Sequence, residues 1–201
     1  MSSAEAVEAV LASLRELHDA IDARARAIAR VHEKRLSCRK GCSACCLDGL
    51  TVRQVEAERI RRAHSDLLER GEPHSEGGCA FLDGDGACRI HADRPSVCRT
   101  QGLPLRILFE DDTGEIVERR DICPLNLAGG PPLDRLAEDA CWLIGPFELE
   151  LARLDEDLAA VMAIVDGTSE ETRSVASGDG AGSTGKGEVP RIALRDLFRP
   201  G

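Results

Sequence analysis

The cysteines are the residues of this sequence whose type and spacing point most directly to chemistry. Four of them lie within nine residues, at Cys38, Cys42, Cys45 and Cys46. Such close spacing brings thiols together without help from the rest of the fold, and tetrahedral zinc sites and iron–sulfur clusters both use thiolates grouped in this way. Successive side chains point in different directions, so Cys45 and Cys46 are poorly placed to bind one ion. Either they bind different metal ions or only one of them is a ligand.

A second group of cysteines lies between residues 79 and 123. Asp83 and Gly84 favour a two-residue hairpin turn, which would place Cys79 opposite Cys88 with Cα atoms about 5 Å apart. The remaining members of this group are Cys98 and Cys123. We therefore expect all eight cysteines at positions 38–123 to be metal ligands. The alternative, that they are only small buried apolar residues, leaves their clustering unexplained.

Basic residues stand beside these cysteines. Sites built from several thiolates carry net negative charge, so we expect Arg94 and Arg99, which lie near Cys98, to donate hydrogen bonds to sulfur and to balance its charge. Arg39 and Lys40 either do the same or are simply solvated.

The ninth cysteine, Cys141, lies in an apolar stretch without flanking arginines. We expect it to be a neutral packing residue, because burial in apolar surroundings raises the pKa of a thiol.

Composition narrows the classes of function. The chain of 201 residues has 26 basic and 36 acidic side chains and a net charge of −10, so it lacks the basic surface that binds nucleic acid. Its N-terminal residues include no apolar region of a signal peptide, and no apolar run is long enough to span a bilayer. We therefore expect a cytoplasmic protein with neither nucleic acid nor membrane as a partner. In that reducing compartment, clustered thiols favour metal binding over disulfides.

Apolar periodicity predicts the helices that must position the cysteines. A seven-residue spacing that includes Val7, Leu14 and Ile21 predicts a long N-terminal helix, begun by a capping box of Ser2 and Glu5. We expect this helix to pack within the chain, with a coiled-coil dimer as the alternative.

Further elements follow from caps, breakers and turn residues. A second helix is expected from Thr51 to Gly71, a short one begins at residues 94–95, and a long one runs from Pro146 to Gly167. A hairpin is expected from Leu105 to Arg119, turning at residues 111–114.

These elements indicate an α+β fold, in which a small cysteine-rich metal-binding core with short β-hairpins packs against long N- and C-terminal helices. We expect four parts: an N-terminal amphipathic helix (1–36), the cysteine-cluster core (37–125), a C-terminal helical segment (126–167), and a flexible linker and tail (168–201). Residues 102–167 hold five basic and fifteen acidic side chains. This acidic face or the terminal residues 189–198 could meet a protein partner, and those terminal residues could instead dock back on the chain. A solvated surface and a frayed end are the simpler expectations.

The order of the cysteine motifs resembles the zinc- or iron-chelating family that is named for its CxxCxxCC motif. The resemblance covers residues 36–125 and is carried by Cys38, Cys42, Cys45 and Cys46, then Cys79-x-Phe81-Leu82, Cys88-x-Ile90, Arg94-Pro95-x-x-Cys98-Arg99 and Cys123-Pro124. Two features depart from the family pattern. Three residues rather than two separate Cys38 from Cys42, and His91 stands where the family has Tyr. We expect His91 to replace a packing ring, with an added metal ligand as the alternative.

The resemblance implies metal chelation with no established reaction. The leading hypothesis is a protein that binds zinc or iron, an iron–sulfur cluster included, and gains folding energy from the metal. One alternative is an iron–sulfur redox or S-adenosylmethionine-linked enzyme or accessory, because Cys38-x3-Cys42-x2-Cys45 also matches the spacing of radical S-adenosylmethionine clusters. Another is a metal-stabilised protein-interaction module. The sequence has no recognisable catalytic motif, so no catalytic residue is assigned and enzymatic activity is not expected.

Overall fold

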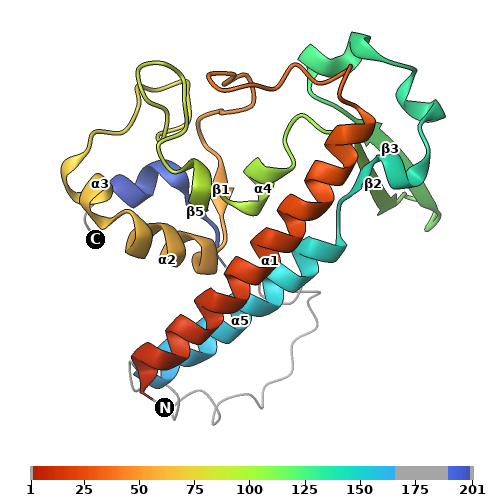
Figure 1. Ribbon diagram of the computed structural model, residues 1–201. Helices are drawn as coiled ribbons and strands as arrows, with labels where there is room; N and C mark the ends of the chain where they lie inside the picture. The colour runs from red at the N-terminus through yellow and green to blue at the C-terminus, as the bar shows by residue number, and fades with distance from the viewer. Residues whose placement is uncertain (1, 166–189, 200–201) are drawn as a thin grey trace.

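Two long helices form one side of the molecule. The computed structural model describes residues 2–165 and 190–199 of the chain. Helix α1 spans Ser3–Val31 and helix α5 spans Pro146–Val165, and the two lie side by side and antiparallel (Figure 1). The Ser2 hydroxyl accepts a hydrogen bond from the backbone N–H of Glu5, whose carboxylate accepts one from Ser2. The predicted capping box and the start of α5 at Pro146 are thus confirmed.

The apolar stripe of α1 is buried against α5. Leu14 and Ile21 of α1 and Leu158 of α5 are almost fully inaccessible to solvent. Trp142 closes the upper end of this core, and its ring stacks on that of Phe147 with 5.0 Å between centroids. The stripe that the sequence analysis identified therefore packs within the chain, as expected.

A second apolar core lies under the cysteine loops. Helices α2 (Gln54–Ala63) and α3 (Ser65–Arg70) border it, and Val52, Ile60 and Phe81 are buried in it. Helix α4 (Ser96–Arg99) contacts α1. The single helix expected from Thr51 to Gly71 is wrong, because Thr51–Val52 forms strand β1 and pairs antiparallel with strand β5 (Ile192–Ala193). The Asp155 carboxylate of α5 accepts a hydrogen bond of 2.8 Å from the backbone N–H of Val55 and so joins the two cores.

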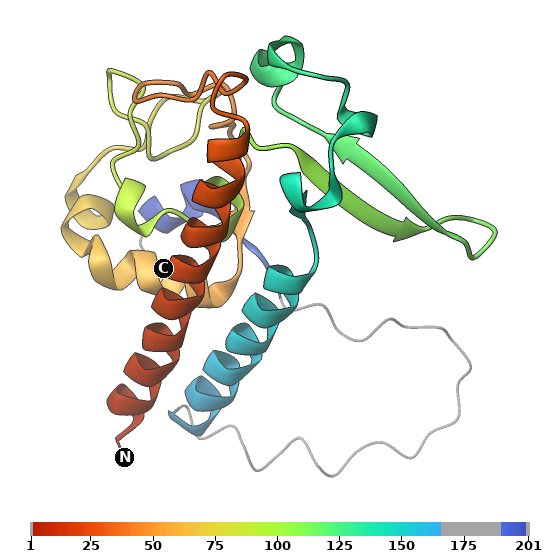
Figure 2. The ribbon, with the colours of Figure 1, turned by 45° about the vertical axis from the view of Figure 1, so that its right-hand side comes forward.

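A twisted hairpin extends from the body beyond the helices (Figure 2). Strands β2 (Leu105–Glu110) and β3 (Ile116–Asp121) pair antiparallel, and β4 (Trp142–Leu143) pairs parallel with β2. The expected hairpin and its turn are confirmed, since the N–H of Gly114 donates to the carbonyl of Asp111. Short 3-10 helices complete the described chain: η1 His91–Asp93, η2 Pro124–Gly129, η3 Leu133–Arg135, η4 Glu138–Ala140 and η6 Leu194–Phe198. The α+β class is confirmed.

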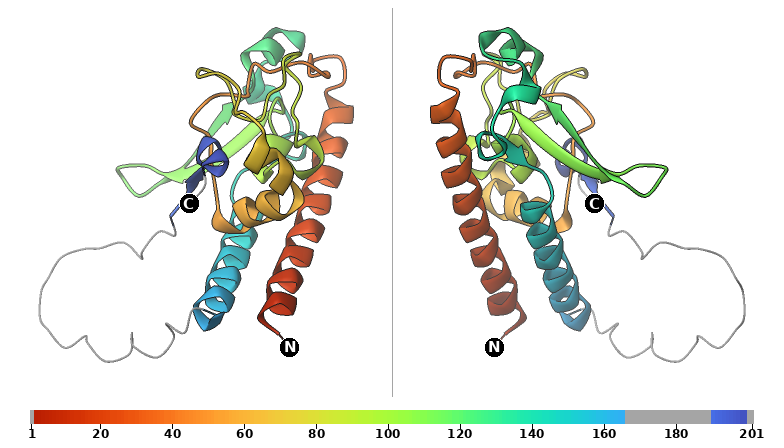
Figure 3. Two further views of the ribbon diagram at one scale, coloured as in Figure 1. Left: turned by 90° about the vertical axis from the view of Figure 1, so that its left-hand side faces the viewer. Right: turned by 90° about the vertical axis from the view of Figure 1, so that its right-hand side faces the viewer.

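The end of the chain docks on the second core. Helix η6 lies beside α2 and α3 (Figure 3), where Leu194 and Leu197 are buried. For residues 190–199 the expected flexible tail is therefore wrong, while residues 166–189 of the expected linker lie outside the described residues. None of the helices in the described ranges combines the length and apolar character needed to cross a membrane.

The packing of α1 on α5 predicts the effect of a core truncation. Leu14 is 0% exposed, so Leu14→Ala is expected to lower the free energy of unfolding by about 2–5 kcal/mol through lost apolar burial and a residual cavity. Leu149 on α5 is 67% exposed, and Leu149→Ala is expected to change stability by less than about 0.5 kcal/mol. Denaturant unfolding of both variants tests this difference, and equal effects would contradict the packing.

Candidate metal centre

The first four cysteines lie on an irregular loop that follows α1. Two tight turns shape it: the N–H of Cys42 donates to the carbonyl of Arg39, and the N–H of Cys46 donates to the carbonyl of Ser43, each over 2.9 Å. Gly41 supports the first turn with a φ of +82°, a conformation that costs little only for glycine. The loop therefore folds back on itself and gathers its thiols.

One group of thiols, called here the first thiol set, consists of Cys38, Cys42, Cys45 and Cys123. Burial raises the pKa of the Cys38 thiol, and the charges of the other three members, which lie nearby, raise it further. Cys123 comes from a distant part of the sequence, directly before η2. The fold therefore brings it to the loop of the other three.

Asn126 ties this set together, and sequence reasoning missed it. Its side chain is 0% exposed. The amide oxygen accepts from the N–H of Ser37 over 2.8 Å, and the amide nitrogen donates to the carbonyl of Gly102 over 2.8 Å and to the Cys38 sulfur over 3.6 Å. The backbone N–H of Asn126 donates to the carbonyl of Cys123. The only signal in the sequence was an amide side chain three residues after Cys123.

Gly102 explains how closely the backbone approaches this set. A Cβ atom built on this residue would lie 2.4 Å from the Cys38 sulfur, and its φ is +90°. Both the contact and the backbone conformation exclude a larger residue. Gly102 thus lets the Cys38 sulfur approach this backbone and the Asn126 amide.

The other group, the second thiol set, consists of Cys46, Cys79, Cys88 and Cys98. The N–H of Cys79 donates to the carbonyl of Cys46 over 2.9 Å, and Cys46, Cys79 and Cys88 all pack in the second core. Burial raises the pKa of Cys98 on α4 to about 12, and the nearby Cys79 and Cys88 contribute to this increase. The second set is therefore more deeply enclosed than the first, in which Cys38 is exposed.

The turn between Cys79 and Cys88 differs from the prediction. The Asp83 carboxylate accepts from the N–H groups of Asp85 and Ala87, and the N–H of Asp83 donates to the carbonyl of Ala87. The loop is therefore longer than the expected two-residue turn, and Leu82 rather than Cys79 pairs with Cys88. Both cysteines pack in the second core, and the charge of Cys79 adds to the raised pKa of Cys88, which burial mainly causes.

Cys45 and Cys46 lie where the two sets meet. A hydrogen bond from the Cys46 thiol lowers the pKa of Cys45 to about 6 and raises the pKa of Cys46. The charge of Cys45 raises the pKa of Cys38 in the first set and of Cys98 in the second, whereas the charges of Cys79 and Cys98 raise the pKa of Cys46. The consecutive pair thus spans both groups.

The arginines expected to donate to sulfur have other partners. Arg99 donates to the Asp22 carboxylate of α1 over 2.7 Å, and Arg94 donates to the same carboxylate over 3.2 Å. In the described parts of the chain neither guanidinium donates to a sulfur, so they join α1 to the segment of Cys98.

His91 is exposed and contacts Arg94, which contradicts its expected role as a packed ring. Cys141 is only 2% exposed, and burial raises its pKa, as expected for a packing residue.

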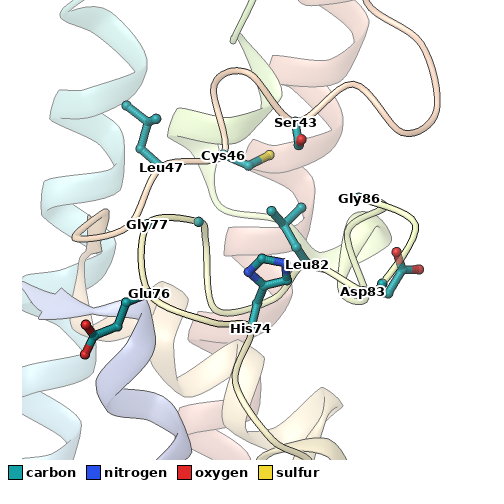
Figure 4. Close-up of a pocket in the computed structure, with 11 residues that line it drawn as sticks. Ser43, Cys46, Leu47, His74, Glu76, Gly77, Leu82, Asp83 and Gly86 are labelled. Carbon is teal, nitrogen blue, oxygen red and sulfur yellow. The ribbon is translucent and has the colours of Figure 1, made fainter.

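A hollow of about 530 Å³ opens beside Cys46 of the second thiol set. Its walls include Cys46, the His74 ring, Asp83 and the backbone of residues 77–78 (Figure 4). Cys46 is therefore the member of this set that solvent reaches through the hollow.

The donor chemistry of both sets fits zinc or iron. Each set supplies four thiols, the ligands that these metals use in closed tetrahedral sites and in clusters. Among residues 2–165 and 190–199, no three Cys, His, Asp or Glu side chains are already close enough together to hold a metal ion. Binding therefore requires the sulfurs of a set to turn toward a common point, and none of the nine cysteines is engaged in a disulfide.

Comparison with known proteins agrees with this chemistry. No curated protein and no solved structure matched the chain. Residues 37–124, which contain both thiol sets, match the family model CxxCxxCC, described as a "Putative zinc- or iron-chelating domain". This part of the chain is thus similar to the metal-chelating family whose cysteine motif the sequence displays.

Proposed function

We propose that this protein chelates zinc or iron through two four-thiolate sites, one in each thiol set. Giving Cys45 to the first site and Cys46 to the second accounts for their adjacency, since neighbouring side chains cannot readily point at one ion. Support comes from the grouping of eight thiols that four separate segments of the chain contribute. The family match over residues 37–124 supports metal chelation in general.

The protein's own residues prepare each site. Asn126 orients the Cys38 sulfur, and the backbone hydrogen bond between Cys79 and Cys46 sets the distance between two segments of the second set. Arg89 and Arg94 partly offset the effect of burial on the pKa of Cys88 and so favour its thiolate. When bound, zinc or iron would cross-link loops that have little regular secondary structure.

Metal content tests this proposal. Protein purified without oxygen or chelator is expected to carry about two metal ions per chain if each mononuclear site uses four thiolates. Elemental analysis with an absorption spectrum distinguishes the metals, because zinc gives no visible band whereas an iron–sulfur cluster gives a brown protein that contains sulfide. Protein that holds neither zinc nor iron would overturn the proposal.

Cysteine variants test the division into two sets. Cys123→Ser is expected to lose the metal of the first set and to keep that of the second. Cys79→Ser is expected to lose the metal of the second set and to keep that of the first. Cys141→Ala is the matched control, because this thiol is buried outside both sets, and it is expected to retain all the metal. Metal loss from the Cys141 variant equal to that from Cys123→Ser would show that the ligand assignment is wrong.

Asn126 provides a test that leaves every cysteine in place. Asn126→Ala removes the amide contact to Cys38 and leaves the carbonyl of Gly102 without this partner. We expect metal affinity at the first set to fall about 10–100-fold and the free energy of unfolding to fall by about 1–3 kcal/mol. Chelator competition and denaturant unfolding measure the two effects. Ser37→Ala is the control, since it keeps the backbone N–H that bonds Asn126, and equal metal affinity in both variants would contradict this role.

A further inference from the structure

The C-terminal segment (190–199) docks directly below the second thiol set. Strand β5 pairs with β1, and the N–H of Leu194 donates to the carbonyl of Leu50 over 2.9 Å. Beyond this strand, the Phe198 ring packs on that of Phe81 with 5.0 Å between centroids. Phe81 lies two residues after Cys79, so the segment packs beneath the loop that carries this cysteine.

Arg195 makes the most specific contacts of the segment. Its guanidinium donates to both carboxylate oxygens of Asp48, over 2.8 and 2.9 Å. It also donates to the carbonyls of His74 over 2.7 Å and of Gly78 over 3.0 Å. Its side chain is 20% exposed and that of Asp48 is 28% exposed. This two-pronged pairing of guanidinium and carboxylate is directional as well as attractive.

These contacts join the two loops that carry thiols of the second set. Asp48 lies two residues after Cys46, and Gly78 directly precedes Cys79. Asp48 also accepts a hydrogen bond from the N–H of Gly77. Arg195 therefore reinforces the backbone hydrogen bond between Cys46 and Cys79 and helps to set the separation of their sulfurs.

We propose that the C-terminal segment is an intramolecular clasp for the second thiol set, with Arg195 as its positioning residue. The inference rests on the proposed metal site of that set. Because the segment favours the arrangement of the two loops that binds metal, metal must in turn favour docking of the segment by the same factor. Release of the segment is therefore expected to weaken metal binding at the second set and to leave the first set unchanged.

The first experiment measures zinc binding to the full chain by competition with a chromophoric chelator. Arg195→Gln is expected to weaken one zinc equivalent about 10–100-fold, the range seen when residues that orient metal ligands are lost, and to leave the other unchanged. Arg195→Lys keeps the charge without the two-pronged contact and is expected to lie between Arg195→Gln and the natural chain. Arg199→Gln is the control, because Arg199 pairs only locally with Asp196 and is 74% exposed.

The reciprocal experiment follows amide hydrogen exchange at Leu194 and its neighbours. Removal of zinc is expected to speed exchange in the C-terminal segment, and Cys79→Ser is expected to do the same in the presence of zinc. Cys123→Ser, which alters the first set, is expected to leave exchange slow.

The outcomes separate this inference from the proposed function. A natural chain that binds no metal removes the proposed function itself. If the natural chain binds two zinc equivalents and Arg195→Gln binds both with unchanged affinity, the clasp is overturned. Arg195→Lys takes the place of Arg195→Gln in this comparison if Arg195→Gln does not fold. Exchange in the segment that does not respond to zinc overturns the reciprocal link.

Discussion

Irregular loops must satisfy their backbone N–H and C=O groups without the ladders of helices and sheets, and this constraint governs the region that carries the cysteines. Two polar side chains, Asn126, which is buried, and Arg195, which is half-buried, supply several of the missing partners. The Asn126 amide bonds the backbone of Ser37 and Gly102, and the Arg195 guanidinium donates to the carbonyls of His74 and Gly78. Each of these side chains also reaches a thiol-bearing loop. The same contacts that make the loops stable therefore position the sulfurs.

A third polar group connects the helical scaffold to the second thiol set. The Glu56 carboxylate of α2 accepts from the N–H of Ser96 over 2.7 Å at the start of α4, the helix that carries Cys98. Burial raises the pKa of Glu56, but hydrogen bonds from His18 and Ser96 outweigh it and the pKa is lowered. Burial also lowers the pKa of His18, whose Nε2 lies 3.4 Å from the Glu56 carboxylate. In this way α1 and α2 together determine where Cys98 lies.

Local features of the fold were predictable from the sequence because their causes are local. The capping box of Ser2 and Glu5, the start of α5 at Pro146 and the turn at residues 111–114 depend on residues a few positions apart. The failures have distant causes. Thr51 belongs to a strand because residue 193 pairs with it, and Arg195 docks because Asp48, 147 residues away, accepts its hydrogen bonds. In the sequence alone, nothing distinguishes Arg195 or Asp48 from the solvated charged residues around them.

At the candidate site too, the sequence predicts some features and not others. Residue type and spacing predict eight thiols as metal ligands, because clustered cysteines are a chemical signal in themselves, and this assignment stays a prediction. Their partners were not predictable: Arg94 and Arg99 adjoin Cys98 in sequence yet pair with Asp22 of α1, whereas Asn126 contacts Cys38 across 88 residues.

The two thiol sets differ in their burial and in the charge of their neighbours. The first set has an exposed cysteine, and its sulfur contact comes from a neutral amide. The second lies in an apolar core, and the guanidiniums of Arg89, Arg94 and Arg195 lower the pKa values of its buried thiols, opposing the effect of burial. Deeper burial makes an unpaired thiolate costlier there, so cationic neighbours matter most at the second set. It is at this set that the chain places its C-terminal segment.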